Sequence, residues 1–302
     1  MRFNLYLQNH GTVIQDLVLH LQKSLESCGH VAYFGTKLVR GACNIIIENF
    51  GPKLVEATID LASSGTPVIV WASEEITGET FNMNVAESDS HYGDREHWKL
   101  RYDNFATVAE HASAVWVSAE PLLPAYRALV PAENPVQFVP HGYAEGFADV
   151  SQRPESQKNI DIYFSGTPTP HRKDLLARLG TKHSVLTHHA EAPEFLRREY
   201  LSRAKVCLSL RLGPETRLPS SSRIHYLVSN RCFMLQEQCP VPGHLDGVVV
   251  PVAYADLPDA CAEALAATDR QARADAMLER LRRELPMREI MPRLLDEAFA
   301  SR

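Results

Sequence analysis

The segment Leu218-Pro-Ser-Ser-Ser-Arg-Ile-His-Tyr-Leu-Val-Ser-Asn-Arg-Cys-Phe-Met-Leu-Gln-Glu237 contains a loop, a helix and a strand in succession. Pro219 and the serines after it predict a loop and a helix N-cap, because a serine hydroxyl can accept from the first free backbone N–H groups. Asn230 predicts the end of the helix, and the apolar residues 232–235 predict a buried strand that carries Glu237 at its carboxyl end. The apolar residues spaced for one helical face are Ile224, Leu227 and Val228.

Arg223 is the unusual residue of this segment. It falls in the first turn of the predicted helix, where the positive end of the helix dipole disfavours a cation. An anion bound at the same helix end would explain the placement, since helix N-termini bind phosphate. For one isolated case, a solvated surface arginine is the ordinary alternative.

The composition is that of a globular protein, with 302 residues, 45% hydrophobic and 23% charged, and the length predicts two domains. The formal net charge of -6 argues against a nucleic-acid-binding surface. The six cysteines show no CxxC spacing, so we expect reduced thiols and a cytoplasmic location. Residues 1–20 show no signal-peptide pattern, and no run of about 18 apolar residues predicts a membrane span, which leaves peripheral membrane contact open.

Short apolar segments alternate with helical periodicity along the first half of the chain. This alternation predicts a parallel sheet with right-handed crossovers, which is an α/β fold. We place an N-terminal Rossmann-like domain at residues 1–150. Its strands are predicted at 2–8, 31–34, 44–47, 67–71, 114–117 and 136–139.

The alternation restarts after an aperiodic linker at residues 144–158. We place a C-terminal Rossmann-like domain at residues 151–285. The final segment, 286–302, is too short to form a domain and is expected to pack back toward the N-terminal domain as a helix. The helical pattern that closes the chain is expected to break at Pro286 and Pro292. Further strands are predicted at 160–164, 184–187, 206–210 and 247–250.

Polar and cationic side chains follow the predicted strands of the second domain, where ligands bind in open α/β sheets. Arg172 repeats the position of Arg223 in a first helical turn, and Arg211 follows another strand. Together these arginines are expected to surround a diphosphate with charge-assisted bonds. Glu237 is placed to accept from ribose hydroxyls. Singly, each residue is read as a surface salt bridge or a cap; together they predict an anion site.

The order of these motifs resembles the C-terminal donor half of group 1 glycosyltransferases, and more closely their CgeB-like branch. The resemblance rests on a strand followed by Ser165-Gly-Thr167, on Pro170-His-Arg172, and on the S-S-R-I-x-Y-L pattern at 221–227 before an apolar strand and an acid. Phe138-Val-Pro-His-Gly-Tyr-Ala-Glu-Gly-Phe147 is similar to the segment that these enzymes carry before their second domain. The likeness covers roughly residues 136–252.

The resemblance implies the GT-B architecture, in which two Rossmann-like, doubly wound domains face each other across a cleft. It also implies a nucleoside-diphosphate sugar as donor and no metal or other cofactor. Glu237 would hold the ribose, and the donor phosphates would be faced by Gly166, Thr167, Arg172, Ser222 and Arg223. The chain departs from the family where His225 and Tyr226 stand in place of the first of two glutamates. The sugar contacts and a retaining or inverting outcome therefore stay open.

The first domain is expected to bind the hydroxyl acceptor, which is left open as a glycan, a lipid-linked molecule, a protein or a small molecule. His10 closes the first strand and is the first candidate for the catalytic base, with Glu75 and Glu74 after the fourth strand as the second. For His10, a turn residue bonded to its own backbone is the equal alternative. The histidines that we read as surface residues are His91, His97, His188 and His189.

Motifs of other enzyme classes are absent from the sequence: there is no P-loop, nucleophile elbow, H-E-x-x-H pair or dinucleotide fingerprint. There is also no Asp-x-Asp clamp for a metal–diphosphate, and an enzyme without it needs cations and helix dipoles at the leaving group. The sequence thus predicts a metal-independent glycosyltransferase. The alternatives are an epimerase or hydrolase acting on nucleotide-sugars, a catalytically degenerate nucleotide-sugar-binding protein and, as a lesser subtype, nucleic-acid glycosylation.

Overall fold

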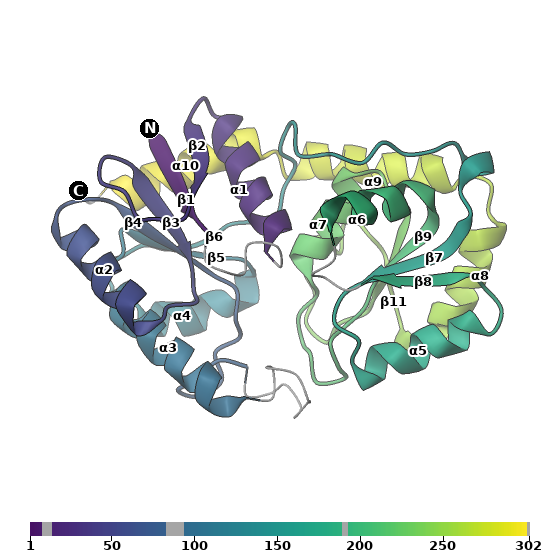
Figure 1. The fold of residues 1–302 in the computed structure, drawn as a ribbon, viewed down its shortest axis with the longest axis horizontal. Helices are drawn as coiled ribbons and strands as arrows, with labels where there is room; N and C mark the ends of the chain where they lie inside the picture. Colours follow the sequence, from purple (N-terminus) through teal and green to yellow (C-terminus); the bar gives the residue numbers. More distant parts are fainter. Residues whose placement is uncertain (8–13, 83–93, 189–192, 301–302) are drawn as a thin grey trace. The chain divides into compact units, whose positions relative to one another are not determined.

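The computed structural model describes residues 1–7, 14–82, 94–188 and 193–300. The chain divides into two compact units, which we call unit 1 and unit 2 (Figure 1). Unit 1 comprises Met1–Ala144 together with Met287–Arg302, and unit 2 comprises Glu145–Pro286. Within the described ranges, no helix is both long and apolar enough to cross a membrane.

Unit 1 is built on a parallel sheet of six strands. They are β1 (Arg2–Tyr6), β2 (Val31–Gly35), β3 (Cys43–Ile47), β4 (Val68–Ala72), β5 (Ala114–Val117) and β6 (Val136–Phe138). Their order across the sheet is β2-β1-β3-β4-β5-β6. The order reverses direction between β1 and β3, because the chain passes from β1 to β2 on one side and returns to β3 on the other. Such a reversal is the place where α/β sheets open a crevice at the carboxyl ends of the strands.

Helices cover both faces of this sheet (Figure 1). They are α1 (Gln15–Glu26), α2 (Pro52–Ser63), α3 (Arg95–Ala109), α4 (Leu123–Leu129) and α10 (Met287–Phe299). α1 contacts α10, and α2 contacts α3. Right-handed crossovers that run in opposite directions place their helices on opposite faces, so α1 and α2 lie on opposite sides of the sheet.

α10 continues through Pro292, where we expected a break. Proline has no N–H to donate to the carbonyl four residues earlier, which is that of Arg288. The Cys28 thiol, two residues after α1, lies 3.7 Å from this carbonyl oxygen and 3.4 Å from that of Ser24. A polar group far away in sequence thus lies beside the carbonyl that the helix leaves without its usual donor. The other expected break is present, since α9 (Arg270–Glu284) ends before Pro286.

Unit 2 is built on a parallel sheet of five strands. They are β7 (Ile160–Ser165), β8 (Val185–His188), β9 (Ala204–Ser209), β10 (Met234–Glu237) and β11 (Pro251–Val252). Their order is β11-β10-β9-β7-β8, which places the switch point of this sheet between β7 and β9.

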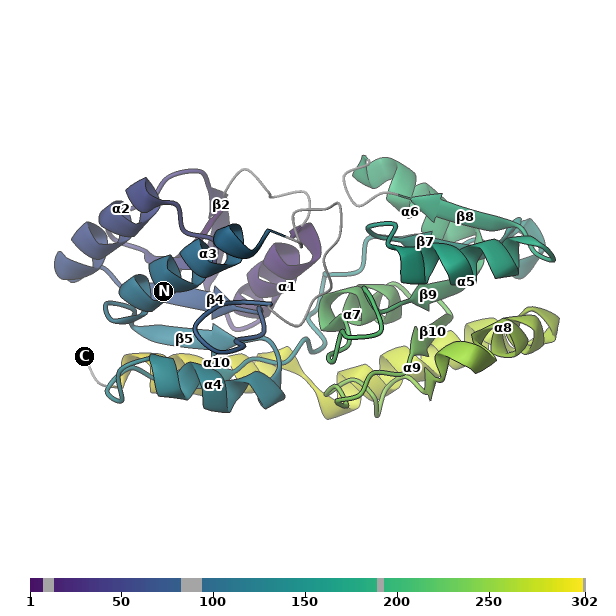
Figure 2. The ribbon, with the colours of Figure 1, turned by 90° about the horizontal axis from the view of Figure 1, so that it is seen from below.

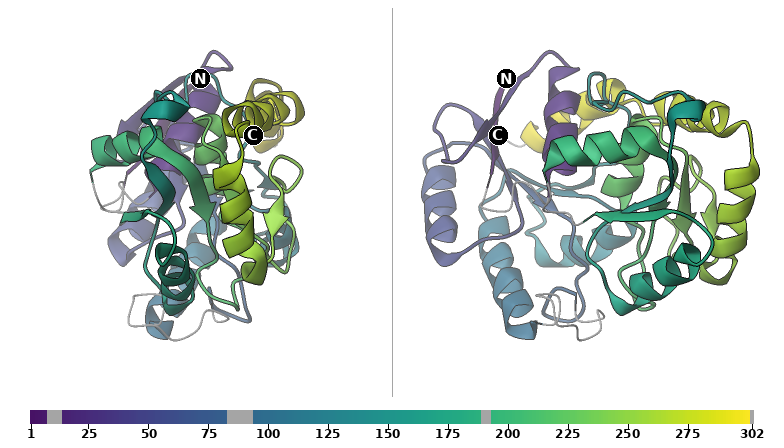
Figure 3. Two further views of the ribbon diagram at one scale, coloured as in Figure 1. Left: turned by 90° about the vertical axis from the view of Figure 1, so that its right-hand side faces the viewer. Right: turned by 45° about the vertical axis from the view of Figure 1, so that its right-hand side comes forward.

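The helices of unit 2 also lie on both faces of its sheet (Figures 2 and 3). They are α5 (Pro170–Gly180), α6 (Glu194–Arg203), α7 (Ser221–Ser229), α8 (Leu257–Ala266) and α9. α5 contacts α8, and the apolar core beneath them joins strand residues such as Ile162, Val206 and Leu235. α7 contacts α9. The predicted α/β class, with parallel sheets and interleaved helices, is therefore confirmed.

The strand that we expected at 247–250 is a turn, and the short β11 follows it. Val248 and Val249 are buried as an apolar run should be, but their N–H groups both donate to the Leu245 carbonyl, at 2.8 and 3.0 Å. A short apolar run can be buried in a tight turn as well as in a strand, and periodicity alone does not distinguish the two structures. β10 also begins later than expected, so that Glu237 is its last residue.

Candidate functional site

Arg172 joins the two loops that leave the sheet of unit 2 at its switch point. It stands in the first turn of α5, where Thr169 is the N-cap and accepts from the Arg172 N–H. Its guanidinium donates to three backbone carbonyls: Nη1 to Thr167 at 2.9 Å, Nη2 to Leu210 at 2.8 Å and Nε to Arg211 at 2.8 Å. Thr167 follows β7 and the other two acceptors follow β9, so one side chain holds both strand ends. Carbonyls do not neutralise its charge, and Arg172 is only 5% exposed.

Gly166 is the point on which two guanidinium groups converge. Its φ of +149° lies outside the range that other residues favour. A Cβ at this position would lie 2.8 Å from Arg223 Nη2 and 3.3 Å from Arg172 Nη1. Both guanidinium carbons also lie over the Phe164 ring, Arg172 at 5.2 Å and Arg223 at 5.6 Å from its centroid. The absence of a side chain at Gly166 therefore allows two cations to approach one stretch of backbone.

The N-terminus of α7 lacks the serine cap that we expected. Ser220 is the N-cap residue, but its side chain makes no capping hydrogen bond, so this prediction is wrong. The first turn contains Ser222 and Arg223 and no acidic residue. The helix dipole and the first-turn N–H groups thus lie beside a cation, an arrangement that favours a bound anion.

Glu237 lies in the interior of unit 2 at 1% exposure. His171 donates from Nε2 to Oε1 at 2.8 Å, and the Arg211 N–H donates to Oε2 at 2.9 Å. The Arg211 guanidinium stands 3.8 Å from Oε1. The His171 ring stacks on Tyr254, with centroids 4.2 Å apart. The structure thus brings together Arg211, Glu237 and the ring of His171, to which the sequence analysis gave no role of its own.

Arg211 also closes the loop that follows β9. Its Nε donates to the Thr216 carbonyl at 2.9 Å, and Nη2 donates to that of Pro214. Like Arg172, Arg211 donates hydrogen bonds to backbone carbonyls, and these bonds fix a loop at the carboxyl edge of the sheet.

In unit 1, the acids after β4 belong to a hydrogen-bonded loop. Glu74 accepts from Arg101 Nη2 at 3.0 Å on one carboxylate oxygen and from Asn82 Nδ2 at 2.7 Å on the other. Its carbonyl accepts from the Tyr126 hydroxyl at 2.8 Å. The backbone of Glu75 pairs with Asn82 in both directions, at 2.8 and 3.2 Å. Asn82 closes the loop in a left-handed conformation, with φ of 54°.

Glu48 is a titratable residue that sequence reasoning missed. It follows β3 at the switch point of unit 1, is 0% exposed, and accepts from both the hydroxyl and the N–H of Ser73. Burial, with a smaller contribution from Glu74, raises its pKa from 4.5 to about 8, and Arg101 opposes the shift. The sequence contained the signal, because Glu48 directly follows an apolar run, as Arg211 follows the predicted strand at 206–210.

Replacing Glu48 with glutamine is expected to flatten the pH dependence of stability. Because the folded-state pKa is the higher one, the folded protein binds more protons than the unfolded chain between about pH 4.5 and 8. The free energy of unfolding of the wild type should fall as pH rises through this window. The glutamine amide does not titrate, so the variant should lack the part of this fall that comes from Glu48. Urea unfolding across the window measures it, with the exposed Glu56→Gln as control. An identical slope in wild type and Glu48→Gln would contradict the assignment.

Some predicted residues lie outside the described residues, among them His10, His91 and His189. The N–H of His97 is capped by Asp94 at 3.0 Å at the start of α3. The surface reading of His188 is wrong: it is 8% exposed and its Nδ1 lies 3.2 Å from the Tyr163 hydroxyl. Its ring is buried because it packs against the rings of Tyr163 and Tyr200, with centroids 6.3 and 5.5 Å away.

The solved structures with this fold include sucrose-phosphate synthase from Thermosynechococcus elongatus, at a TM-score of 0.58 and 14% identity, covering 100% of this chain and 100% of that chain. They also include α,α-trehalose 6-phosphate synthase from Burkholderia multivorans, at a TM-score of 0.51 and 12% identity, covering 96% of this chain and 75% of that chain. Neither a protein-family model nor a curated protein matches the sequence. The likeness establishes the fold, two Rossmann-like parallel sheets of the GT-B type, and so confirms the predicted resemblance at that level. The closer likeness to the CgeB-like branch stays a prediction.

Proposed function

We propose that this chain is a glycosyltransferase that binds a nucleoside-diphosphate sugar in unit 2 and transfers the sugar to a hydroxyl acceptor. The observation that carries the proposal is the convergence of Arg172 and Arg223 on Gly166. Two guanidinium groups over one ring repel each other, and a bound diphosphate would turn that repulsion into charge-assisted hydrogen bonds. The position is the switch point of the sheet, where α/β proteins bind nucleotides.

In the proposed reaction, the acceptor oxygen bonds to the anomeric carbon while the bond from that carbon to the diphosphate oxygen breaks. The acceptor proton passes to a base, and the electron pair leaves with the diphosphate. Arg223, Ser222 and the first-turn N–H groups of α7 stabilise the departing charge without a metal. Arg172 adds its charge and holds Gly166 and Thr167 in place through the Thr167 carbonyl.

The ribose hydroxyls are proposed to contact the pair formed by Glu237 and His171. Arg211 supports this pair, since its N–H donates to the Glu237 carboxylate. For the base, His10 is proposed first and Glu75 second. Glu74 is the weakest of the predicted bases because both of its carboxylate oxygens already accept hydrogen bonds.

Calorimetric titration with nucleoside diphosphates and their sugar conjugates tests the proposal. We expect micromolar binding, protection against thermal unfolding, and sugar transfer once a hydroxyl acceptor is supplied. Absence of any nucleotide binding would overturn the proposed site. Rapid formation of an epimer or a free sugar without acceptor would identify an epimerase or hydrolase. Binding without turnover across a broad acceptor screen would identify a nucleotide-sugar-binding protein.

A further inference from the structure

Glu48 and Ser73 form a hydrogen-bonded pair at the carboxyl edge of the sheet of unit 1. Glu48 directly follows β3 and Ser73 directly follows β4, and these two strands are neighbours in the sheet. The Ser73 hydroxyl donates to Glu48 Oε1 at 2.7 Å, and the Ser73 N–H donates to Oε2. Glu48 is 0% exposed, whereas Ser73 is exposed. A buried carboxyl group is thus hydrogen-bonded to the hydroxyl of a serine at the surface.

Three neighbouring residues surround this carboxyl group. Glu74, next to Ser73 in the loop, accepts from Arg101 of α3 at 3.0 Å, and its carbonyl accepts from Tyr126 of α4 at 2.8 Å. Arg101 also donates to the Glu48 carbonyl at 2.8 Å. Burial, and then the charge of Glu74, raise the pKa of Glu48 to about 8. Arg101 and the bonds from Ser73 oppose the shift. Glu48 therefore exchanges its proton near physiological pH.

The proton on Glu48 decides which role the Ser73 hydroxyl takes. When Glu48 is ionised, its Oε1 accepts the hydroxyl hydrogen of Ser73, and the lone pairs of the serine oxygen can accept a hydrogen bond from a ligand. When Glu48 is protonated, its O–H donates to the serine oxygen, and the serine hydrogen is available to a ligand. A hydroxyl ligand in contact with Ser73 can therefore pass a proton to Glu48 through the serine.

We propose that Ser73 contacts the hydroxyl group of the acceptor and that Glu48 receives its proton through Ser73. The inference rests on the proposed function and supplies its base, in place of His10 or Glu75. As the acceptor oxygen bonds to the anomeric carbon, its proton moves to Ser73 Oγ and the Ser73 proton moves to Glu48 Oε1. The bond from the anomeric carbon to the diphosphate oxygen breaks, and its electron pair leaves with the diphosphate. Ser73 is the catalytic residue, and Glu48 acts through it and later returns the proton to water by the reverse route.

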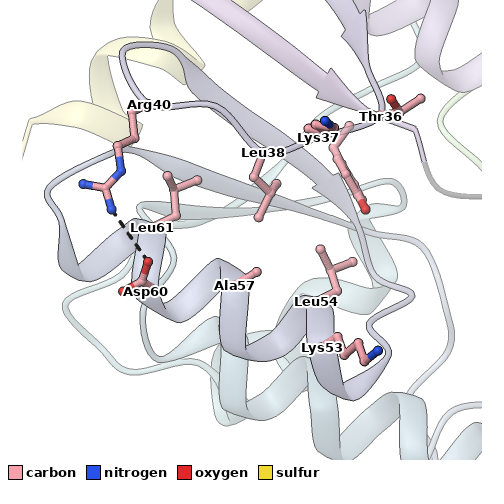
Figure 4. Close-up of a pocket in the computed structure, with 10 residues that line it drawn as sticks. Thr36, Lys37, Leu38, Arg40, Lys53, Leu54, Ala57, Asp60 and Leu61 are labelled. Carbon is pink, nitrogen blue, oxygen red and sulfur yellow. Dashed lines mark ion pairs between the residues drawn. The ribbon is translucent and has the colours of Figure 1, made fainter.

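Infrared difference spectroscopy tests the pair without any ligand. When the pH rises through the Glu48 pKa of about 8, wild type should lose the C=O stretch of one protonated carboxyl group, and Glu48→Gln should lack this change. Ser73→Ala removes a hydroxyl donor that favours the charged form, so the midpoint should rise. Asp60→Asn is the matched control and should titrate as wild type, because Asp60 is an exposed acid of the same unit, paired with Arg40 at 3.7 Å (Figure 4).

The pH dependence of sugar transfer tests the relay in the reaction. The donor is the nucleoside-diphosphate sugar that binds in the titration above, and the acceptor is glycerol. The kcat/KM of wild type should rise with pH and level off above about 8, because ionised Glu48 is the active form. Glu48→Gln should transfer at least about 100-fold more slowly and show no such rise. Its amide can still accept from the Ser73 N–H and donate to the serine oxygen, so the loop should keep its structure.

Further variants separate the relay from a structural role. Ser73→Ala should lose transfer to the same extent as Glu48→Gln, and the double variant should be no slower than either one, because the two residues act as a unit. Ser73→Thr keeps a hydroxyl and should restore transfer. Thr77→Ala, which removes a hydroxyl from an exposed residue of the same loop, should transfer as wild type. All of these variants should keep nucleoside diphosphate binding, which the proposed function assigns to unit 2.

Three results would overturn the relay. They are an unchanged infrared midpoint in Ser73→Ala, transfer by Glu48→Gln as fast as by wild type, and a rise of the wild-type rate near about 6.5, the ordinary pKa of a histidine base. Each of them leaves the proposed function intact. Absence of nucleotide binding in wild type would overturn the proposed function and the relay with it.

Discussion

Arg172→Ala is expected to lower the free energy of unfolding by about 3 kcal/mol, because each buried group left without its partner costs about 1–3 kcal/mol. The variant frees the carbonyls of Thr167, Leu210 and Arg211, which the guanidinium now satisfies. It also releases the two strand ends from each other, so nucleotide binding should fall along with stability. Urea unfolding followed by circular dichroism measures the change.

Arg178→Ala is the matched control for this prediction. Arg178 lies on the same helix, with a 43% exposed side chain that pairs with Asp174 at 3.3 Å, and surface pairs of this kind contribute little. Arg172→Lys keeps the charge but cannot reach three acceptors in a plane, so it should behave more like alanine than like wild type. Full stability in Arg172→Ala would show that its hydrogen bonds do not hold the loops.

Arg223→Ala is expected to weaken nucleoside diphosphate binding about 10- to 100-fold, which corresponds to one or two lost charge-assisted hydrogen bonds. The change in stability should be small, because Arg223 is half-buried and stands at the helix start, where a cation is disfavoured in the absence of an anion. Calorimetry gives the affinity, and thermal unfolding without ligand gives the stability. A loss of stability with unchanged affinity would refute the anion site.

Gly166→Ala tests the same site from the backbone side. The new methyl group would lie within 2.8 Å of Arg223 Nη2 and would displace that guanidinium. We expect weaker nucleotide binding, as in Arg223→Ala, together with a loss of stability of about 1–3 kcal/mol from the strained backbone. The double variant should bind little worse than Arg223→Ala alone, since both changes remove one interaction.

Most of the fold was predictable because its signals are local. Apolar runs such as Cys43–Ile47 and Val68–Ala72 alternate with helical periodicity, and that alternation allows little besides a parallel sheet. The predictions were wrong where the same local sequence is compatible with two structures. The valines at 247–250 are apolar enough for a strand but form a turn. Pro292 should break a helix, and a thiol more than 250 residues away in sequence accompanies its continuation.

The sequence predicted where the candidate site lies, at the carboxyl ends of the strands of unit 2. It did not predict which groups its side chains would bond. Strand ends meet at one edge of a parallel sheet, so Arg211 and Glu237 were both expected at the edge where the ligand binds, and the structure places them in contact there. The partners of each donor could not be predicted, because a guanidinium donates to backbone carbonyls as well as to phosphates, and which of them is in reach depends on the tertiary structure. Arg172, for example, was expected to contact the donor phosphates, whereas the hydrogen bonds that the structure describes for its guanidinium go to backbone carbonyls.

The sequence by itself determined the α/β class, the parallel sheets and the places where polar side chains leave the strands, because these follow from periodicity and from the residue types at strand ends. Only the tertiary structure decided that Arg172 and Arg223 converge on Gly166 and that Glu48 is buried with a raised pKa. The physical reason is that burial, electrostatic shifts and cavities depend on distances between groups far apart in the chain, and sequence spacing does not encode those distances.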